Sequence, residues 1–106
     1  MWHMVTTATA VISRNPETIA TEIDGEVMLM SLITGRTFGL DKRGSRIWEL
    51  IEQPLTVSEL VGKLLARYET TAERCQADVL DFVGKMESNQ LATISEPGVA
   101  NAPQPA

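Results

Sequence analysis

The chain has 106 residues, of which 43% are hydrophobic and 22% are charged, and its formal net charge is −5 at pH 7. Length and composition indicate one soluble globular domain, and the acidic balance argues against broad electrostatic binding to DNA, RNA or anionic lipid. The only cysteine is Cys75, which excludes an intrachain disulfide, and the longest apolar run is far too short to span a bilayer. We therefore expect a cytoplasmic protein that attaches to neither membranes nor nucleic acids.

The two ends of the chain lack the patterns of packed elements. Residues 1–10 show no hydrophobic periodicity, and the segment 95–106 holds three of the five prolines. Such segments cannot bury enough apolar surface to offset the entropy cost of ordering. We expect both ends to be flexible and the folded domain to span 11–94.

The first half of the domain is patterned as an antiparallel sheet. Asp24-Gly25 is a type I′ hairpin signature, and Thr34-Gly35 is a weaker turn signal. These turns separate three predicted strands, at 18–24, 26–33 and 36–41.

The middle predicted strand, 26–33, is apolar on both faces, as is typical of a central strand, whereas the strand before it alternates. The strand at 36–41 then lies at an edge of the sheet. A further short strand at 10–14 is a candidate for joining the same sheet.

The second half changes to helical periodicity. Asp41 is placed to cap a helix over 42–53. Thr56 and Glu59 form a capping box that opens a second helix, which Tyr68 closes.

A third helix is predicted to run to Ser88, with Thr70 and Glu73 as a possible capping box at its start. The element order is then βββααα. We predict an α+β fold that is winged helix-turn-helix-like, with a three-stranded antiparallel sheet followed by a three-helix bundle.

Catalytic chemistry is poorly represented. The only histidine, His3, falls in the segment expected to be flexible, and Cys75 falls on the inner face of the third helix. A nucleophilic cysteine needs a positioned base, and a metal site needs several ligands at suitable spacing. We therefore expect no catalytic residue, no metal and no cofactor, and a protein that is not an enzyme.

The edge strand at 36–41 has features of a binding site. It contains no proline and no lysine, the residues that commonly protect a sheet edge from pairing with another chain. Gly39 lies inside the strand, where a glycine marks either a bulge or a place that another backbone approaches closely. The pattern favours a peptide that binds by adding a strand.

Basic residues gather at the same place, since four of the nine lie between positions 36 and 46. Lys42 and Arg43 fall at the N-terminal end of a helix, where the helix dipole disfavours cations by about 0.3–1 kcal/mol each. This arrangement either hints at an acidic partner or consists of exposed, screened charges.

A helix beside the edge would complete a groove, with Val79 at its floor and four residues of the third helix near its rim. The residues that we expect to contact the peptide are Arg36, Thr37, Phe38, Gly39, Leu40, Asp41, Asp78, Val79, Phe82, Lys85 and Met86. The methionines at 28, 30 and 86 either line an adaptable surface or fill the core.

Several blocks of the sequence carry a resemblance to a known family. They are 29–41, ending in Phe38-Gly39-Leu40-Asp41; 44–51, containing Ile47-Trp48-Glu49-Leu50; 56–60; Tyr68; and Asp78-Val79-Leu80. Over residues 10–94 the chain resembles the D-protein family of PQQ biosynthesis, the precursor-peptide recognition elements of ribosomally made, modified peptides. Within it, the phrase 35–41 looks most like the stand-alone leader-binding proteins of lasso-peptide clusters. One departure is Glu52-Gln53-Pro54, which replaces the usual glycine turn and puts the connection between the first two helices in doubt.

The resemblance implies that a leader peptide binds as an added antiparallel strand on 36–41, beside the third helix. It implies presentation to processing enzymes, namely a leader peptidase of the cysteine-protease type and a cyclase. An alternative is a chaperone of the PQQ precursor for a radical-SAM enzyme. The alternative of another class is a winged-helix DNA-binding protein, which the third helix disfavours because 71–90 holds four carboxylates and two cations. The edge leaves both a monomer and an edge-paired dimer open.

Overall fold

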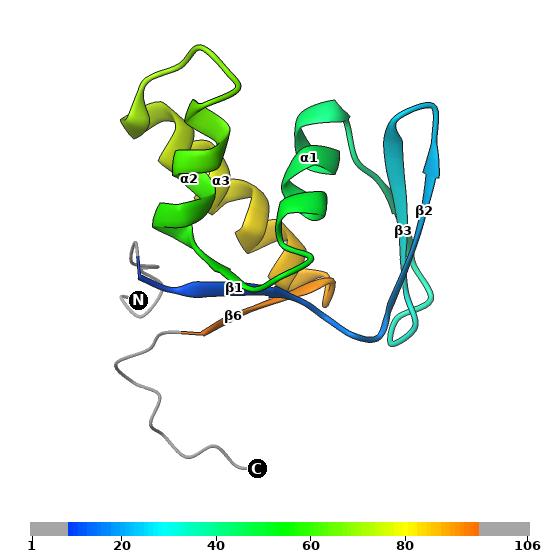
Figure 1. Cartoon of the computed structure of the whole chain (residues 1–106). Coiled ribbons are helices and arrows are strands. Elements are labelled where there is room, and N and C mark those ends of the chain that lie inside the picture. The colour runs from blue at the N-terminus through cyan, green and yellow to red at the C-terminus, as the bar shows by residue number, and fades with distance from the viewer. Residues whose placement is uncertain (1–8, 96–106) are drawn as a thin grey trace.

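Two small antiparallel sheets and three helices make up residues 9–95, the part of the chain that the computed structural model describes (Figure 1). The elements are β1 (Val11–Arg14), β2 (Thr18–Ile23), β3 (Glu26–Ser31), β4 (Thr37–Gly39), α1 (Lys42–Leu50), β5 (Leu55–Thr56), α2 (Val57–Leu65), α3 (Ala72–Ser88) and β6 (Ala92–Ser95). The predicted α+β class, a three-stranded meander followed by three helices, is confirmed.

The meander has the order β2-β3-β4, with both pairings antiparallel. Its first turn is of the predicted kind, because Asp24 and Gly25 both have positive φ, of 55° and 82°. β3 ends at Ser31 instead of residue 33, because Ser31 Oγ accepts hydrogen bonds from the N–H groups of Ile33 and Thr34 at 3.1 Å. These bonds turn the chain away from the sheet, so the two apolar residues that follow Ser31 lie in a turn. β4 is correspondingly shorter than the predicted 36–41.

The strand predicted at 10–14 exists but does not join the meander. β1 pairs instead with β5 and with β6, a strand that the sequence patterns did not predict. Ala10 is fully buried and its carbonyl accepts from Val57 N–H at 3.0 Å, while Ser95 pairs with Val11. The packed structure therefore includes Ala10 and Ser95, which the sequence placed in the flexible ends. The expectations for 1–8, including His3, and for 96–106 lie outside the described residues.

The helix starts follow the predicted caps with one correction. Asp41 caps α1, and both halves of the capping box of Thr56 and Glu59 are present at α2. α3 is capped by Thr71 and not by Thr70, because Thr71 Oγ1 accepts from Arg74 N–H at 3.1 Å. That choice puts Arg74 at the third helical position, where no carboxylate can complete a box.

The C-terminal end of α1 differs from the prediction, whereas its start at Lys42 agrees. α1 stops at Leu50 and is followed by a turn, so that the segment before Pro54 is not helical. The connection between α1 and α2, which the family resemblance put in doubt, therefore consists of this turn and the two-residue strand β5.

The core is formed by buried side chains of the three helices, of β3 and of the sheet that contains β1 and β6, and α1 lies between the β2–β3 hairpin and the pair of α2 and α3 (Figure 1). Val27 and Leu29 of β3 are buried against it, as is Cys75 of α3. Arg14 joins β1 to α1, because its guanidinium lies 4.4 Å from the centre of the Trp48 ring and donates to the Trp48 carbonyl. Within the described residues, no helix combines the length and apolar character needed to cross a membrane.

Candidate functional site

The hydrogen bonds of β4 show which of its backbone groups are used inside the sheet. Leu40 N–H donates to the Val27 carbonyl at 2.8 Å, and Ser31 N–H donates to the Arg36 carbonyl at 3.0 Å. In an antiparallel pair, successive residues of a strand bond alternately to one side and the other. The even-numbered residues from Arg36 to Leu40 therefore bond toward β3.

The backbone groups of the odd-numbered residues, Thr37 and Gly39, point away from the sheet. Phe38, which lies opposite Leu29, also bonds toward β3, because it is two residues from both Arg36 and Leu40. The N–H and C=O groups of Thr37 and Gly39 therefore point away from β3. Among the residues that the structure describes, β4 has no further strand beside it in its sheet. The backbone of Thr37 and Gly39 thus offers donors and acceptors to another chain.

Gly39 lies in the outward-bonding part of this edge. Its register with Met28 is unbroken, so the bulge that the sequence allowed is not formed. A Cβ at this position would meet only Met28 Sδ, at 3.3 Å. The space beside it is a hollow open to solvent, formed by the β2–β3 hairpin and the end of β4, with the lining residues Ile23, Asp24, Glu26, Val27, Met28, Gly39, Leu40 and Asp41.

A buried serine fixes the end of β4 against α1. Ser45 is 2% exposed, its Oγ accepts from Val27 N–H at 2.8 Å, and it donates to the Leu40 carbonyl at 3.3 Å. Asp41 then caps α1 by accepting from Gly44 N–H at 2.8 Å. The strand edge and the helix start therefore hold a defined geometry relative to each other.

Gly44 also brings α3 to this junction. A Cβ on Gly44 would lie 2.9 Å from Cε1 of Phe82, closer than a real Cβ contact. Phe82 is half-buried and packs against the core. The sequence patterns did not mark Gly44 or Ser45 as site residues, although small residues on the inner side of a helix start are a signal of close packing.

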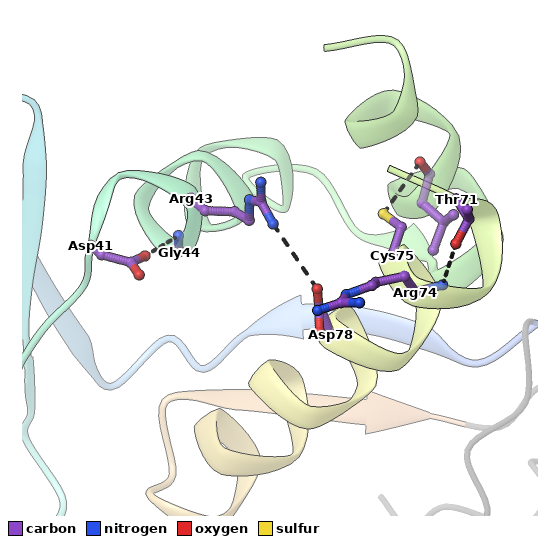
Figure 2. Close-up of polar contacts among 8 residues, drawn as sticks. Asp41, Arg43, Gly44, Thr71, Arg74, Cys75 and Asp78 are labelled. Atoms are coloured by element: carbon purple, nitrogen blue, oxygen red, sulfur yellow. Dashed lines mark hydrogen bonds and ion pairs between the residues drawn. The ribbon is translucent and has the colours of Figure 1, made fainter. Parts of the chain in front are cut away.

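Arg43, one of the two cations at the start of α1, has partners within the chain. It therefore does not require an external acidic partner. Figure 2 shows its guanidinium directed at Asp78 of α3, 4.0 Å away, and it also lies 4.5 Å from the centre of the Tyr68 ring. Arg46 pairs with Glu49 at 3.2 Å, and Arg36 lies over the Phe38 ring. Exposed pairs of this kind contribute little stability. The cation cluster by itself is therefore weak support for an acidic partner.

The residues expected on α3 divide between surface and core. Asp78 is exposed beside Arg43, and Lys85 is exposed and pairs with Asp81 at 3.3 Å. Val79 is buried, as expected of a floor residue, but Met86 is only 3% exposed and belongs to the core, not to a rim. Phe82 is the predicted α3 residue that lies against Gly44, at the start of α1.

The meander has a second edge, at β2, which no sequence pattern singled out. Leu32 N–H donates to the Glu17 carbonyl at 2.8 Å, and the alternation from this bond directs the N–H and C=O of Ala20 away from β3. Ala20 therefore corresponds to Gly39 on the opposite edge and provides a matched site for testing.

Cys75 is unsuited to nucleophilic chemistry. Its side chain is buried, with Sγ 4.0 Å from the Val61 carbonyl oxygen, and burial followed by the nearby Asp78 carboxylate raises the pKa of the thiol (Figure 2). A neutral thiol is a poor nucleophile and a poor metal ligand. Among residues 9–95, no group of three or more His, Cys, Asp or Glu side chains is placed to hold a metal ion.

These features define a small winged helix-turn-helix-like domain whose sheet ends in an open edge. The sequence profile of the family described as coenzyme PQQ synthesis protein D (PqqD) matches residues 26–92, and the chain belongs to this family. A search of curated proteins gave no match.

Two solved structures are similar to this chain. TbiB1 in complex with the TbiA(beta) leader peptide has a TM-score of 0.72 and 34% sequence identity, over 76% of this chain and 93% of that chain. Lasso peptide synthetase B1 complexed with the leader peptide has a TM-score of 0.70 over 77% of this chain and 96% of that chain. Its identity is 17%, so this second likeness shows the shared fold.

Proposed function

We propose that this protein binds the leader region of a ribosomally synthesised precursor peptide as an added strand on β4, and presents it to processing enzymes in lasso-peptide biosynthesis. The observation that carries the proposal is the unpaired backbone of Thr37 and Gly39 at an edge with no protecting residue. The similarity to TbiB1, which was solved with a leader peptide, supports the same ligand class.

An added strand would lie about 4.8 Å from β4 and direct alternate side chains to opposite faces of the sheet. Those on the inner face would meet the side of the sheet that carries Phe38 and Leu40, which are half-buried, and would run toward Phe82. Backbone hydrogen bonds to β4 can form with a peptide of any sequence. We therefore propose that the leader is selected by contacts of its side chains with the inner face of the sheet and with α3. This assignment includes the α3 residues Asp78, Phe82 and Lys85, whereas Val79 and Met86 are buried and support these residues from the core.

Cleavage of the leader belongs to a separate enzyme in this proposal. Cys75 is buried with a raised thiol pKa, and the described residues 9–95 contain no histidine that could act as its base. The protein then acts as a non-enzymatic adaptor in the cytoplasm. Its partners are a leader peptidase of the cysteine-protease type and a cyclase, which meet the peptide while it is held on the sheet.

A second candidate ligand is the precursor peptide of PQQ, presented to a radical-SAM enzyme. The observation that favours it is the family match over residues 26–92, since the family is described by PQQ synthesis. Both ligands would use the same edge. Parallel titration with the two peptides separates them, because the true ligand should bind at least tenfold more tightly.

The test is a titration of isotope-labelled protein with the leader of the precursor encoded beside this gene, followed by amide NMR. We expect saturable shifts centred on the amides of Thr37 and Gly39 and extending to Phe82. Absence of saturable binding would refute the proposal. Shifts centred on Ala20 instead would move the site to the β2 edge and refute the assignment to β4.

A further inference from the structure

The β2 edge of the meander is open and takes no part in the proposed peptide site. β2 is a regular strand of six residues, and every one of them pairs in register with β3. It contains no proline and no lysine, and five of its six residues are exposed. An unbroken, uncovered edge of this kind is a template for pairing with another chain. The lack of protecting residues therefore points to a partner strand.

The backbone groups that a partner strand would meet belong to Thr18, Ala20 and Glu22. The alternation that directs the N–H and C=O of Ala20 away from β3 does the same for the residues two positions before and after it. The side chains of these three residues lie on the inner face of the meander, the side that carries the buried Leu29. Donors and acceptors thus recur at every second position along the edge.

One polar side chain of this edge lacks a hydrogen-bond partner. Thr18 Oγ1 is buried and makes no hydrogen bond to any group of residues 9–95. Buried polar atoms in native proteins are nearly always paired, so an unpaired one at an open edge points to a partner group supplied by another chain. The partner strand should therefore carry a hydrogen-bonding side chain opposite Thr18.

β2 of a second copy meets these requirements in one antiparallel register. With a two-fold axis at Ala20, Ala20 lies opposite itself and Thr18 lies opposite Glu22 of the other copy, so all the outward-bonding residues pair. The Glu22 carboxylate then supplies an acceptor for the unpaired Thr18 hydroxyl. An axis at Glu22 would set two carboxylates against each other. An axis at Thr18 would set Ala20 against Pro16, which has no N–H.

The surroundings of the edge are compatible with a second copy. The hollow beside β2 on the inner face holds one cation and two carboxylates, and its lining residues are Arg14, Ala20, Thr21, Glu22, Val27, Trp48 and Glu49. Because both signs are present, two such surfaces side by side are not limited to like-charge contacts. On the other face, Ile19 would pack against Thr21 of the second copy, which covers a side chain that is 49% exposed in a single chain.

From the unprotected edge, the unpaired hydroxyl and the self-complementary register, we propose that this protein forms a two-fold symmetric dimer in which β2 pairs antiparallel with β2 of a second copy. The two meanders then join into one sheet with the strand order β4-β3-β2-β2-β3-β4. Both β4 edges lie at the outer ends of this sheet, so each copy retains its own peptide site. The dimer does not depend on the proposed function, because β4 takes no part in it.

Sedimentation of the full chain, from about 1 µM to about 1 mM, measures the association. We expect a dimer for the wild type, and a dissociation constant at least about tenfold higher for Ala20→Pro, which removes an outward N–H. Ala20→Glu retains the N–H at an exposed position and sets two carboxylates against each other at the axis, so it should weaken the dimer by at least about tenfold as well. Gly39→Pro makes the matched change on the β4 edge and should leave the dimer within about twofold of wild type. Circular dichroism checks that each variant is folded.

Cross-linking tests the register. Two residues that exchange hydrogen bonds across an antiparallel pair have Cα atoms about 5.5 Å apart, which is within the range that a disulfide spans. In a Cys75→Ala background, which removes the only native cysteine, Ala20→Cys should therefore give a disulfide-linked dimer under mild oxidation. Gly39→Cys in the same background is the matched control and should remain a single chain.

Four results would overturn the dimer proposal. The first is a wild type that sediments as a monomer over the whole range, and the second is a dimer that both variants of Ala20 leave intact. The third is a dimer that Gly39→Pro or saturating leader peptide dissociates, because the contact then lies at β4. The fourth is a series of species larger than a dimer, because pairing of β2 with β4 of the next copy does not close.

Discussion

Replacing Gly39 with proline tests the edge directly, because the substitution removes the outward N–H and puts a ring in the path of an incoming strand. The fold should tolerate it, since the sheet bonds of this segment are made by its neighbours, such as Leu40 N–H to the Val27 carbonyl. The residue before a proline is restricted to extended conformations, and Phe38 is already in a strand.

The expected loss of affinity follows from one edge hydrogen bond. A backbone hydrogen bond contributes about 0.5–1.5 kcal/mol net, and a peptide carbonyl left unpaired in the interface costs about 1–3 kcal/mol. With tenfold in affinity for each 1.4 kcal/mol or so, Gly39→Pro should weaken leader binding between about fivefold and a hundredfold. The free energy of unfolding should change by less than about 1 kcal/mol, because the lost N–H is not used inside the sheet.

Calorimetric titration with the leader peptide measures this loss, and two variants control it. Gly39→Ala retains the N–H, and its methyl group meets only the flexible end of Met28, so affinity should stay within about threefold of wild type. Ala20→Pro makes the same backbone change on the β2 edge and should leave affinity unchanged. Wild-type affinity in Gly39→Pro, or an equal loss in Ala20→Pro, would refute the assignment of the peptide to β4.

Three further predictions concern the support of the edge and the core. Gly44→Ala forces the Phe82 ring aside, because the new Cβ would lie 2.9 Å from it; we expect an overpacking cost of about 1–3 kcal/mol in urea unfolding and weaker leader binding, and unchanged affinity would show that Phe82 does not border the peptide. Ser45→Ala leaves the buried N–H of Val27 unpaired, so denaturant unfolding should show a loss of about 1–3 kcal/mol; an unchanged midpoint would contradict this role. The thiol pKa of Cys75 is raised above its ordinary value of 9.0, so the native state holds this proton more tightly than the unfolded state and stability falls as pH rises past 9.0. The difference in unfolding free energy between wild type and Cys75→Ala should therefore shrink in that range, and a constant difference would contradict a buried neutral thiol.

Much of the local structure follows from residues that are close in the sequence. The Asp24-Gly25 turn, the cap at Asp41 and the capping box at Thr56 depend on side chains within a few positions of the backbone groups that they serve. The exposed edge at β4 could be predicted for the same reason, since two turns and the strands between them define a meander and its outer strand. The box of Thr70 and Glu73 was predicted to open the third helix, but the structure caps α3 at Thr71, so this local pattern did not decide the helix start.

The sequence by itself determined the fold class and the edge, because hydrophobic periodicity and turn chemistry are local properties. Only the tertiary structure decided that β1 pairs with β6 near the other end of the chain, that Met86 is buried and that Arg43 is already partnered. It also decided that Ile19, Ile23 and Met28 face solvent, whereas Val27 and Leu29 face the core. Alternation along a strand shows that two faces exist, but the position of the helices determines which of them is covered.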